Sequence, residues 1–179
     1  MKPAIKKLYD KNISDFGHLP EYQIMGLTIY AEARGEIYQG RLGVGTVILE
    51  RVKYRNWDGQ NIKDVCLWPY QFSCYLSSDP NRVQLLKIAK DFGSFYQKSK
   101  SLQECSNLAK GLIEDTINRD QELAESHCCQ YLTASLRRMI DKQYMSESDK
   151  IKKAEINAKR WWKDMHLIKV IGAHEFYVG

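Results

Sequence analysis

The sequence predicts a mainly α protein with a small β element, an α+β domain in which helices dominate. Apolar residues recur at helical spacing in several segments, whereas residues 167–171, Leu-Ile-Lys-Val-Ile, have the character of a strand. The 179 residues suit one globular domain, and a chain of this length can bury a sizeable core without disulfides. We expect residues 1–20 to be a polar lead-in and residues 21–179 to form the domain.

Helices are expected where the apolar periodicity is strongest. Residues 21–34 begin after Pro20 and end at Gly35, residue types that are typical of helix starts and ends. Residues 40–54 present a face of Val and Ile, and the glycines at their start would allow another backbone to approach closely. Two more helices are expected at residues 82–92 and 102–118.

The remaining segments are less regular. Residues 55–81 contain many turn signals together with aromatic residues, and long loops of this kind tend to be functional. These aromatic residues are Trp57, Trp68, Tyr70, Phe72 and Tyr75. Residues 126–140 are ambiguous, and we expect residues 141–155 to form a mobile surface segment or a hairpin tip. Residues 156–164 are expected to be a short helix that carries Trp161 and Trp162.

Charge, cysteine content and hydropathy exclude several classes of protein. The net charge of +5 is mild, and no dense basic run is interleaved with aromatics, so we expect no nucleic-acid partner. The five cysteines fit neither a paired framework nor a metal-ligand spacing, so we expect free thiols, no metal and no other cofactor. No apolar run reaches the roughly 20 residues of a membrane span, and none follows the charged N-terminus as in a secretory signal.

The stretch with most chemical content is Tyr-Ala-Glu-Ala-Arg-Gly-Glu at residues 30–36. It places Glu32 in the last turn of the first expected helix, where the helix dipole disfavours an ionised carboxylate. Apolar neighbours would add desolvation, and both effects raise the pKa of a glutamic acid. A carboxyl that stays protonated near neutral pH suits general acid catalysis at a glycosidic oxygen. The alternative is a structural Glu32 that pairs with Arg34 or Arg51.

Three ordered motifs resemble the cell wall hydrolase family of spore cortex-lytic enzymes, to which related phage endolysins also belong. The first is the Glu-Ala-Arg-Gly-Glu run followed by the helix that ends in Arg51-Val52. The second is Gln-Phe-Ser-Cys at residues 71–74, and the third is Ile-Gly-Ala-His-Glu-Phe-Tyr at residues 171–177. Together they span nearly the whole chain.

The resemblance implies a lysozyme-like fold and a glycan-cleaving enzyme with peptidoglycan as its substrate. It implies that Glu32 is the catalytic acid and base, as in lytic transglycosylases, which need one carboxylate. Such enzymes cleave between N-acetylmuramic acid (MurNAc) and N-acetylglucosamine (GlcNAc) and leave a 1,6-anhydro-MurNAc end. The alternatives are a hydrolytic muramidase with a second carboxylate and a catalytically idle wall-binding protein.

Two departures from the family pattern bear on these expectations. The family often has His-Tyr where this chain has Gln130-Tyr131, and Trp where it has Tyr75. Spore members usually carry an export signal and a wall-binding repeat, and neither is recognisable here. We therefore expect a phage-type lysin, a monomer that stays in the host cytoplasm until it is released to the wall, without stable insertion in the membrane.

Further polar residues are candidates for contacts with sugar hydroxyls or N-acetyl groups. Gln71 and Ser73 flank an aromatic residue, and a few placed polar groups are typical of a substrate cleft. Glu36 could be a second acid or substrate contact, or could simply order its loop. For His174 a structural hydrogen bond is favoured over proton transfer. Tyr131 and Thr133 complete the set of substrate-binding candidates.

Overall fold

The computed structural model describes residues 2–54 and 60–179 and has the expected class, mainly α with a small β element. The described helices are α1 (Pro3–Phe16), α2 (Glu21–Ala33), α3 (Tyr38–Tyr54), α4 (Ile62–Leu67), α5 (Asn81–Lys90), α6 (Phe92–Lys98), α7 (Lys100–Ile113), α8 (Gln121–Glu125), α9 (Ala134–Ser146) and α10 (Lys150–Ala158), with 3-10 turns η2 (Ser73–Tyr75) and η3 (Trp161–Asp164). The strands are β1 (Gln130–Thr133), β2 (His166–Ile171) and β3 (His174–Val178). None of these helices has the length and apolarity to cross a membrane.

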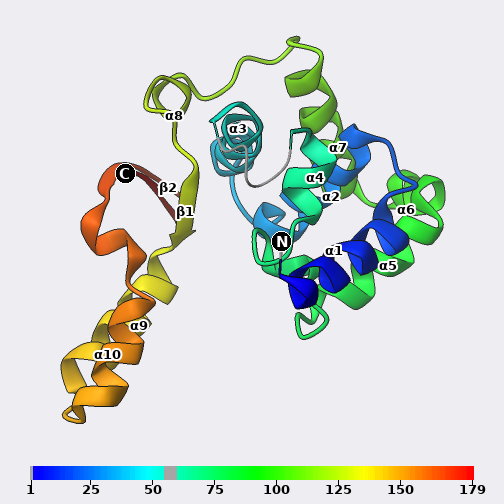
Figure 1. Cartoon of the computed structure of the whole chain (residues 1–179). Coiled ribbons are helices and arrows are strands. Elements are labelled where there is room, and N and C mark those ends of the chain that lie inside the picture. The colour runs from blue at the N-terminus through cyan, green and yellow to red at the C-terminus, as the bar shows by residue number, and fades with distance from the viewer. Residues whose placement is uncertain (1, 55–59) are drawn as a thin grey trace.

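Helices α1–α7 form a body with α2 at its centre, and the sheet with α9 and α10 lies to one side (Figure 1). Helix α2 is buried along most of its length and packs on α3, α4 and α7. Helices α2 and α7 are in close contact at Gly26, where an added Cβ would lie 2.8 Å from the Cα of Ser106. Glycine is therefore required where these two backbones approach each other.

The sheet has the strand order β1-β3-β2, with both pairs antiparallel. Strand β3 is central, and Tyr131 of β1 pairs with Phe176 of β3. The β2–β3 hairpin turns at Gly172, which has a φ of +57°, a left-handed conformation that glycine adopts without steric cost. The sheet therefore depends on β3 for both of its pairings.

Helix α3 joins the sheet to the helical body. Val47 of α3, Ile171 of β2 and Phe176 of β3 belong to one buried apolar cluster. The ring of Phe176 reaches the surface of α3 at Gly43, where an added Cβ would lie 2.6 Å from the ring. Strand β2 is also tied to the start of α8, where Lys169 donates to Asp120 at 3.0 Å. The small residues of α3 thus accommodate side chains, whereas a close backbone approach was expected.

The N-terminal segment is more closely integrated than a polar lead-in. Helix α1 buries Phe16 completely, and its Asn12 side chain donates to the carbonyl of Leu67 at 2.9 Å. Arg82 of α5 donates to Asn12 and forms an ion pair with Asp15. Residues 3–16 are therefore part of the folded body.

Other segments also differ from the expectations. Residues 55–81 contain α4 and η2, while the expected turn and aromatic residues from 55 to 59, including Trp57, lie outside the described residues. Residues 141–155 form most of a helical hairpin of α9 and α10. The ambiguous residues 126–140 supply β1 and the start of α9. The short elements α6, α8 and β3 were not anticipated, because five to seven residues carry little periodicity.

We predict that Gly26→Ala destabilises the protein, because its methyl group meets the backbone of α7 and cannot be relieved by a rotamer change. Overpacking of this kind costs about 1–3 kcal/mol, and each kcal/mol lowers the Tm by roughly 2–4 °C at this size. Gly93→Ala in α6 is the matched control, since an added Cβ there has no atom within 4 Å. A Tm for Gly26→Ala equal to that of the control would contradict the close α2–α7 contact.

Candidate active site

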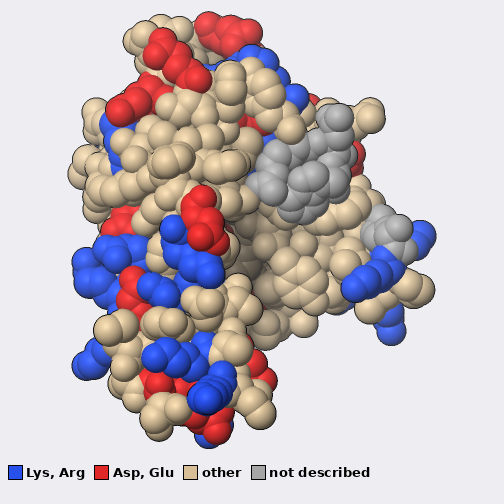
Figure 2. All heavy atoms as spheres, turned by 60° about the vertical axis from the view of Figure 1, so that its left-hand side comes forward, with Lys and Arg blue, Asp and Glu red and all other residues tan. Residues whose placement is uncertain are grey.

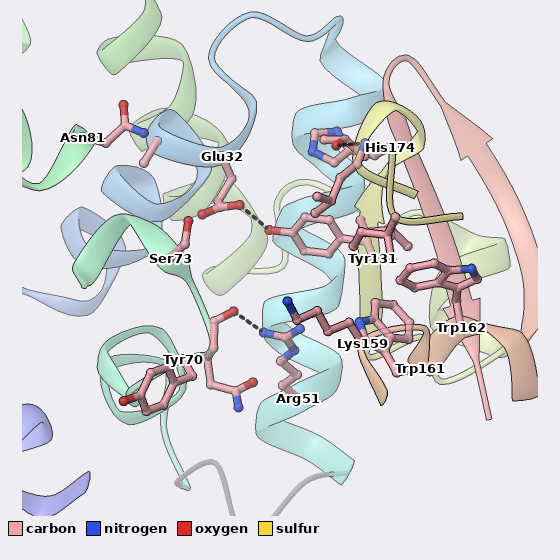
Figure 3. A pocket seen from close by; sticks show the side chains of 16 residues that line it. Glu32, Arg51, Tyr70, Ser73, Asn81, Tyr131, Lys159, Trp161, Trp162 and His174 are labelled. Carbon is pink, nitrogen blue, oxygen red and sulfur yellow. Dashed lines mark hydrogen bonds between the residues drawn. The ribbon is translucent and has the colours of Figure 1, made fainter. Parts of the chain in front are cut away.

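A cleft of about 430 Å³ lies between the helical body and the sheet with its attached hairpin. Figure 3 shows that Glu32, Ser73 and Asn81 face it from the body, and Tyr131, Trp161 and His174 from the other side. The lining residues are Ala31, Glu32, Arg51, Tyr70, Gln71, Ser73, Asn81, Tyr131, Leu132, Thr133, Leu136, Ile140, Lys159, Trp161, Trp162 and His174. Among these described lining residues, Glu32 is the one acidic side chain.

Glu32 is positioned by the end of α2. The helix ends one residue later, at Ala33, so the carboxyl projects from the last turn into the cleft and is half-buried. The hydroxyl of Tyr131 in β1 donates to Glu32 Oε2 at 3.2 Å. Burial raises the pKa of the Glu32 carboxyl above its usual range, as expected for a carboxyl in a partly desolvated site.

The neighbours of Glu32 have opposite effects on the pKa of its carboxyl. Hydrogen bonds from Tyr131 and from the buried thiol of Cys74 lower the Glu32 pKa, and the charge of Arg51 does the same. The negative charge of Asp79 acts with burial to raise the pKa. Because burial is the largest effect, the pKa is raised overall, and protonated Glu32 can serve as a general acid.

Arg51 links the two walls of the cleft. It lies in the C-terminal part of α3, and its Nε donates to the carbonyl of Cys129, just before β1, at 2.9 Å. Its guanidinium also donates to the carbonyl of Gln71 at 3.4 Å and lies over the Phe72 ring, 4.9 Å from its centroid. The side chain therefore fixes the loop at Gln71 relative to the sheet.

Most of the other residues that the sequence suggested for substrate binding lie at the cleft, but not all of them. Gln71, Ser73, Tyr131 and Thr133 line the cleft. Ser73 Oγ also donates to Asp79 at 2.8 Å, and Thr133 Oγ1 accepts the backbone N–H of Leu136 at 3.3 Å, which caps α9. Glu36 lies outside the lining.

Glu36 braces the β2–β3 turn. Its Oε2 accepts the backbone N–H of Ala173 at 3.1 Å, and an added Cβ at Gly172 would lie only 1.9 Å from that oxygen. Of the roles considered from the sequence, this placement supports structural ordering, with the hairpin turn as the partner.

His174 lines the cleft next to Tyr131. It is 3% exposed, its ring lies edge-on to Tyr131 with centroids 5.2 Å apart, and burial lowers its pKa, so the imidazole is neutral at pH 7. The expected structural hydrogen bond is not seen at Nδ1, which has no partner among the described residues. The contacts that hold His174 are mainly aromatic.

Several lining residues were not identified as candidates from the sequence. Asn81 accepts a hydrogen bond from Arg34 at 3.2 Å, and Lys159 enters from the end of α10. Tyr70 is 65% exposed and has a φ of +70°, an unusual conformation for a residue with a side chain. The one sequence signal for Tyr70 was its place among the aromatic residues of segment 55–81, which was expected to be functional. No group of three or more His, Cys, Asp or Glu side chains in the described chain could hold a metal ion.

Comparison with known proteins assigns the family. The family model described as Cell Wall Hydrolase matches residues 35–177, so the chain belongs to the cell wall hydrolase family, enzymes that degrade peptidoglycan. The crystal structure of the catalytic domain of the Bacillus cereus SleB protein is similar, with 19% identity, a TM-score of 0.47, and coverage of 88% of this chain and 89% of that chain. No curated protein matches the chain. Glu32 lies just before the matched segment.

We predict that Glu32→Gln stabilises the fold at neutral pH. A carboxyl with a raised pKa in the folded state favours folding most below its unfolded-state pKa, and this contribution is lost as the pH rises through the folded pKa. Glutamine has no charge to desolvate, so the Tm of the variant should exceed that of the wild type at pH 7, and the difference should disappear near pH 4. Thermal melts across this range measure it, with exposed Glu155→Gln as the control. A lower Tm for Glu32→Gln at pH 7 would contradict the raised pKa.

Proposed function

We propose that this chain cleaves the MurNAc–GlcNAc backbone of peptidoglycan as a lytic transglycosylase, with Glu32 as its catalytic acid and base. The observation that carries the proposal is the cleft itself. Its described lining contains one carboxyl, on Glu32, and burial raises the pKa of that carboxyl. A single residue of this kind is sufficient for transglycosylation, whereas glycoside hydrolysis usually uses a pair.

In the proposed reaction the Glu32 carboxyl acts twice, first as an acid and then as a base. Protonated Glu32 donates to the glycosidic oxygen as the bond from this oxygen to C1 of MurNAc breaks, and GlcNAc leaves with a free 4-hydroxyl. The Glu32 carboxylate then accepts the proton of the MurNAc 6-hydroxyl as O6 bonds to C1. This closes the 1,6-anhydro ring and returns Glu32 to its protonated form, without a water molecule.

Tyr131 holds the acid in position for both steps. Burial keeps the pKa of its hydroxyl well above the usual range, so the group remains a donor at physiological pH. Its hydrogen bond fixes the orientation of Glu32 and stabilises the carboxylate that forms after proton donation. Gln71, Ser73 and Thr133 offer further polar atoms to the sugar, and Trp161 and Tyr70 offer aromatic surface.

Hydrolysis is the second candidate reaction, and Asp79 is the observation that favours it. Its charge acts on Glu32, and its Oδ2 accepts a hydrogen bond from Ser73, which lines the cleft. If Asp79 activated water, the products would carry reducing MurNAc ends, and Asp79→Asn would abolish their release.

The biological setting we propose is that of a phage-type lysin. The chain would act as a monomer on peptidoglycan, after release from the host cytoplasm. The proposal follows from the resemblance of the three sequence motifs to a family that also includes phage endolysins.

We predict that Glu32→Gln lowers the rate of glycan cleavage by at least about a hundredfold, the lower range for loss of a general acid. Digests of purified peptidoglycan, read by mass spectrometry of the soluble fragments, should show 1,6-anhydro-MurNAc ends for the wild type. Glu155→Gln, on the exposed surface of α10, should behave like the wild type. Reducing MurNAc ends would instead show that the reaction is hydrolysis. Wall binding without cleavage by the wild type would favour an idle binding protein.

We predict that Tyr131→Phe moves the alkaline limb of the pH–rate profile to higher pH. The lost hydrogen bond lowers the Glu32 pKa in the wild type, so its removal raises this pKa and keeps the acid protonated further into the alkaline range. Asp79, Arg51 and Cys74 remain in place in the variant. The kcat/KM for soluble glycan strands, measured from pH 4 to 9, tests the shift. Tyr70→Phe, at the exposed edge of the same cleft, should leave the limb unchanged, and a shift to lower pH in Tyr131→Phe would refute the assignment.

A further inference from the structure

The cleft wall opposite Glu32 is built by the α9–α10 hairpin and the turn that follows it. Leu136 and Ile140 of α9 line this wall, and Leu136 is 43% exposed. Trp161 is half-buried, and its ring packs edge-on against Trp162. The wall thus presents apolar surface beside the position of the reacting sugar.

Lys159 adds a positive charge to this apolar wall. It follows directly after α10, and Figure 3 shows its side chain extending into the cleft from the same side as Trp161. Within the described chain, Lys159 forms no ion pair. The neighbouring cations differ, since Arg137 pairs with Glu175 at 2.6 Å and Arg160 pairs with Asp141 at 2.7 Å.

The charge balance of the cleft favours an anionic ligand. Its charged lining side chains are Glu32, Arg51 and Lys159, and His174 is held neutral by burial. While Glu32 is protonated, the lining carries net positive charge. The sugar backbone of peptidoglycan is uncharged wherever its lactyl groups carry peptides, so the backbone alone gives Lys159 no partner. The stem peptides supply an anionic partner for Lys159 and apolar groups that can contact the wall, because they combine free carboxylates with small apolar residues.

We propose that Lys159, Leu136, Ile140 and Trp161 form a subsite for the acidic stem peptide attached to MurNAc. Lys159 binds a peptide carboxylate, and the apolar side chains contact the small residues of the peptide. The subsite rests on the proposed glycan cleavage and adds a preference for peptide-bearing strands over bare ones. Since Lys159 touches the peptide and not the reacting atoms, it acts on KM and leaves kcat unchanged.

General attraction to anionic wall polymers is the competing explanation. Residues 134–164 contain nine Lys and Arg against five Asp and Glu, a surplus of four in a chain whose net charge is +5. Figure 2 shows these charges spread over the lowest lobe of the molecule, where α9 and α10 lie, with both signs intermixed. Lys152, exposed on α10 and outside the cleft lining, provides the matched control for this effect.

The test compares the wild type and Lys159→Gln on two substrates, with and without the peptide. As in a double-mutant cycle, this comparison isolates the coupling between Lys159 and the peptide. The substrates are teichoic-acid-free glycan strands with intact peptides, and the same strands after removal of the peptides by an amidase. For Lys159→Gln we expect a roughly fivefold loss of kcat/KM on intact strands, all of it in KM, and no more than a twofold change on stripped strands. Lys159→Arg should retain most of the wild-type rate, and Lys152→Gln all of it.

Each other result overturns the subsite. Equal losses on both substrates would place Lys159 against the MurNAc unit itself, whose lactyl carboxylate the amidase exposes, and an equal loss in Lys152→Gln would reduce the effect to bulk charge. An unchanged rate for Lys159→Gln on intact strands would remove the lysine from substrate binding. Failure of the wild type to cleave either substrate would instead overturn the proposed function, because the two enzymes could not then be compared.

Discussion

The hydrogen bond from Tyr131 to Glu32 joins the two parts of the molecule at the point where the chemistry is proposed. Glu32 comes from the end of a helix in the body, and Tyr131 from a strand of the sheet. The relative position of these parts is fixed elsewhere. Phe176 packs on Gly43, Arg51 reaches the carbonyl of Cys129, and Glu36 holds the turn at Ala173. These contacts allow a single 3.2 Å interaction to be maintained between residues 99 positions apart.

The same geometry suits the two opposite proton transfers that the proposed mechanism assigns to Glu32. Burial alone would favour the protonated acid too strongly for the second step, in which the group must first exist as a carboxylate. Tyr131, Cys74 and Arg51 stabilise that carboxylate, and Asp79 opposes them. The raised pKa is therefore the result of competing effects.

The sequence predicted the class of fold, and it singled out Glu32, which the structure places in the cleft. Helices α2, α3 and α5 follow from their apolar periodicity and from Pro20 and Gly35, and strand β2 from its β-branched run. Helix α1 was missed because its polar residues, such as Asn12, are buried by tertiary hydrogen bonds that no local pattern reveals. Lys159 was missed for a related reason, since a lysine after a polar helix gives no sign that it faces a cleft.

The order of the strands has a consequence for protein synthesis. Strand β1 has β3 as its neighbour in the sheet, and β3 comprises residues 174–178. During translation, Tyr131 therefore emerges well before the strand that must hold it opposite Glu32. The helical body can fold early, but the acid obtains its hydrogen-bond donor only when the last strand has left the ribosome. A nascent chain that has not yet released residues 174–178 would thus carry Glu32 in an incomplete site.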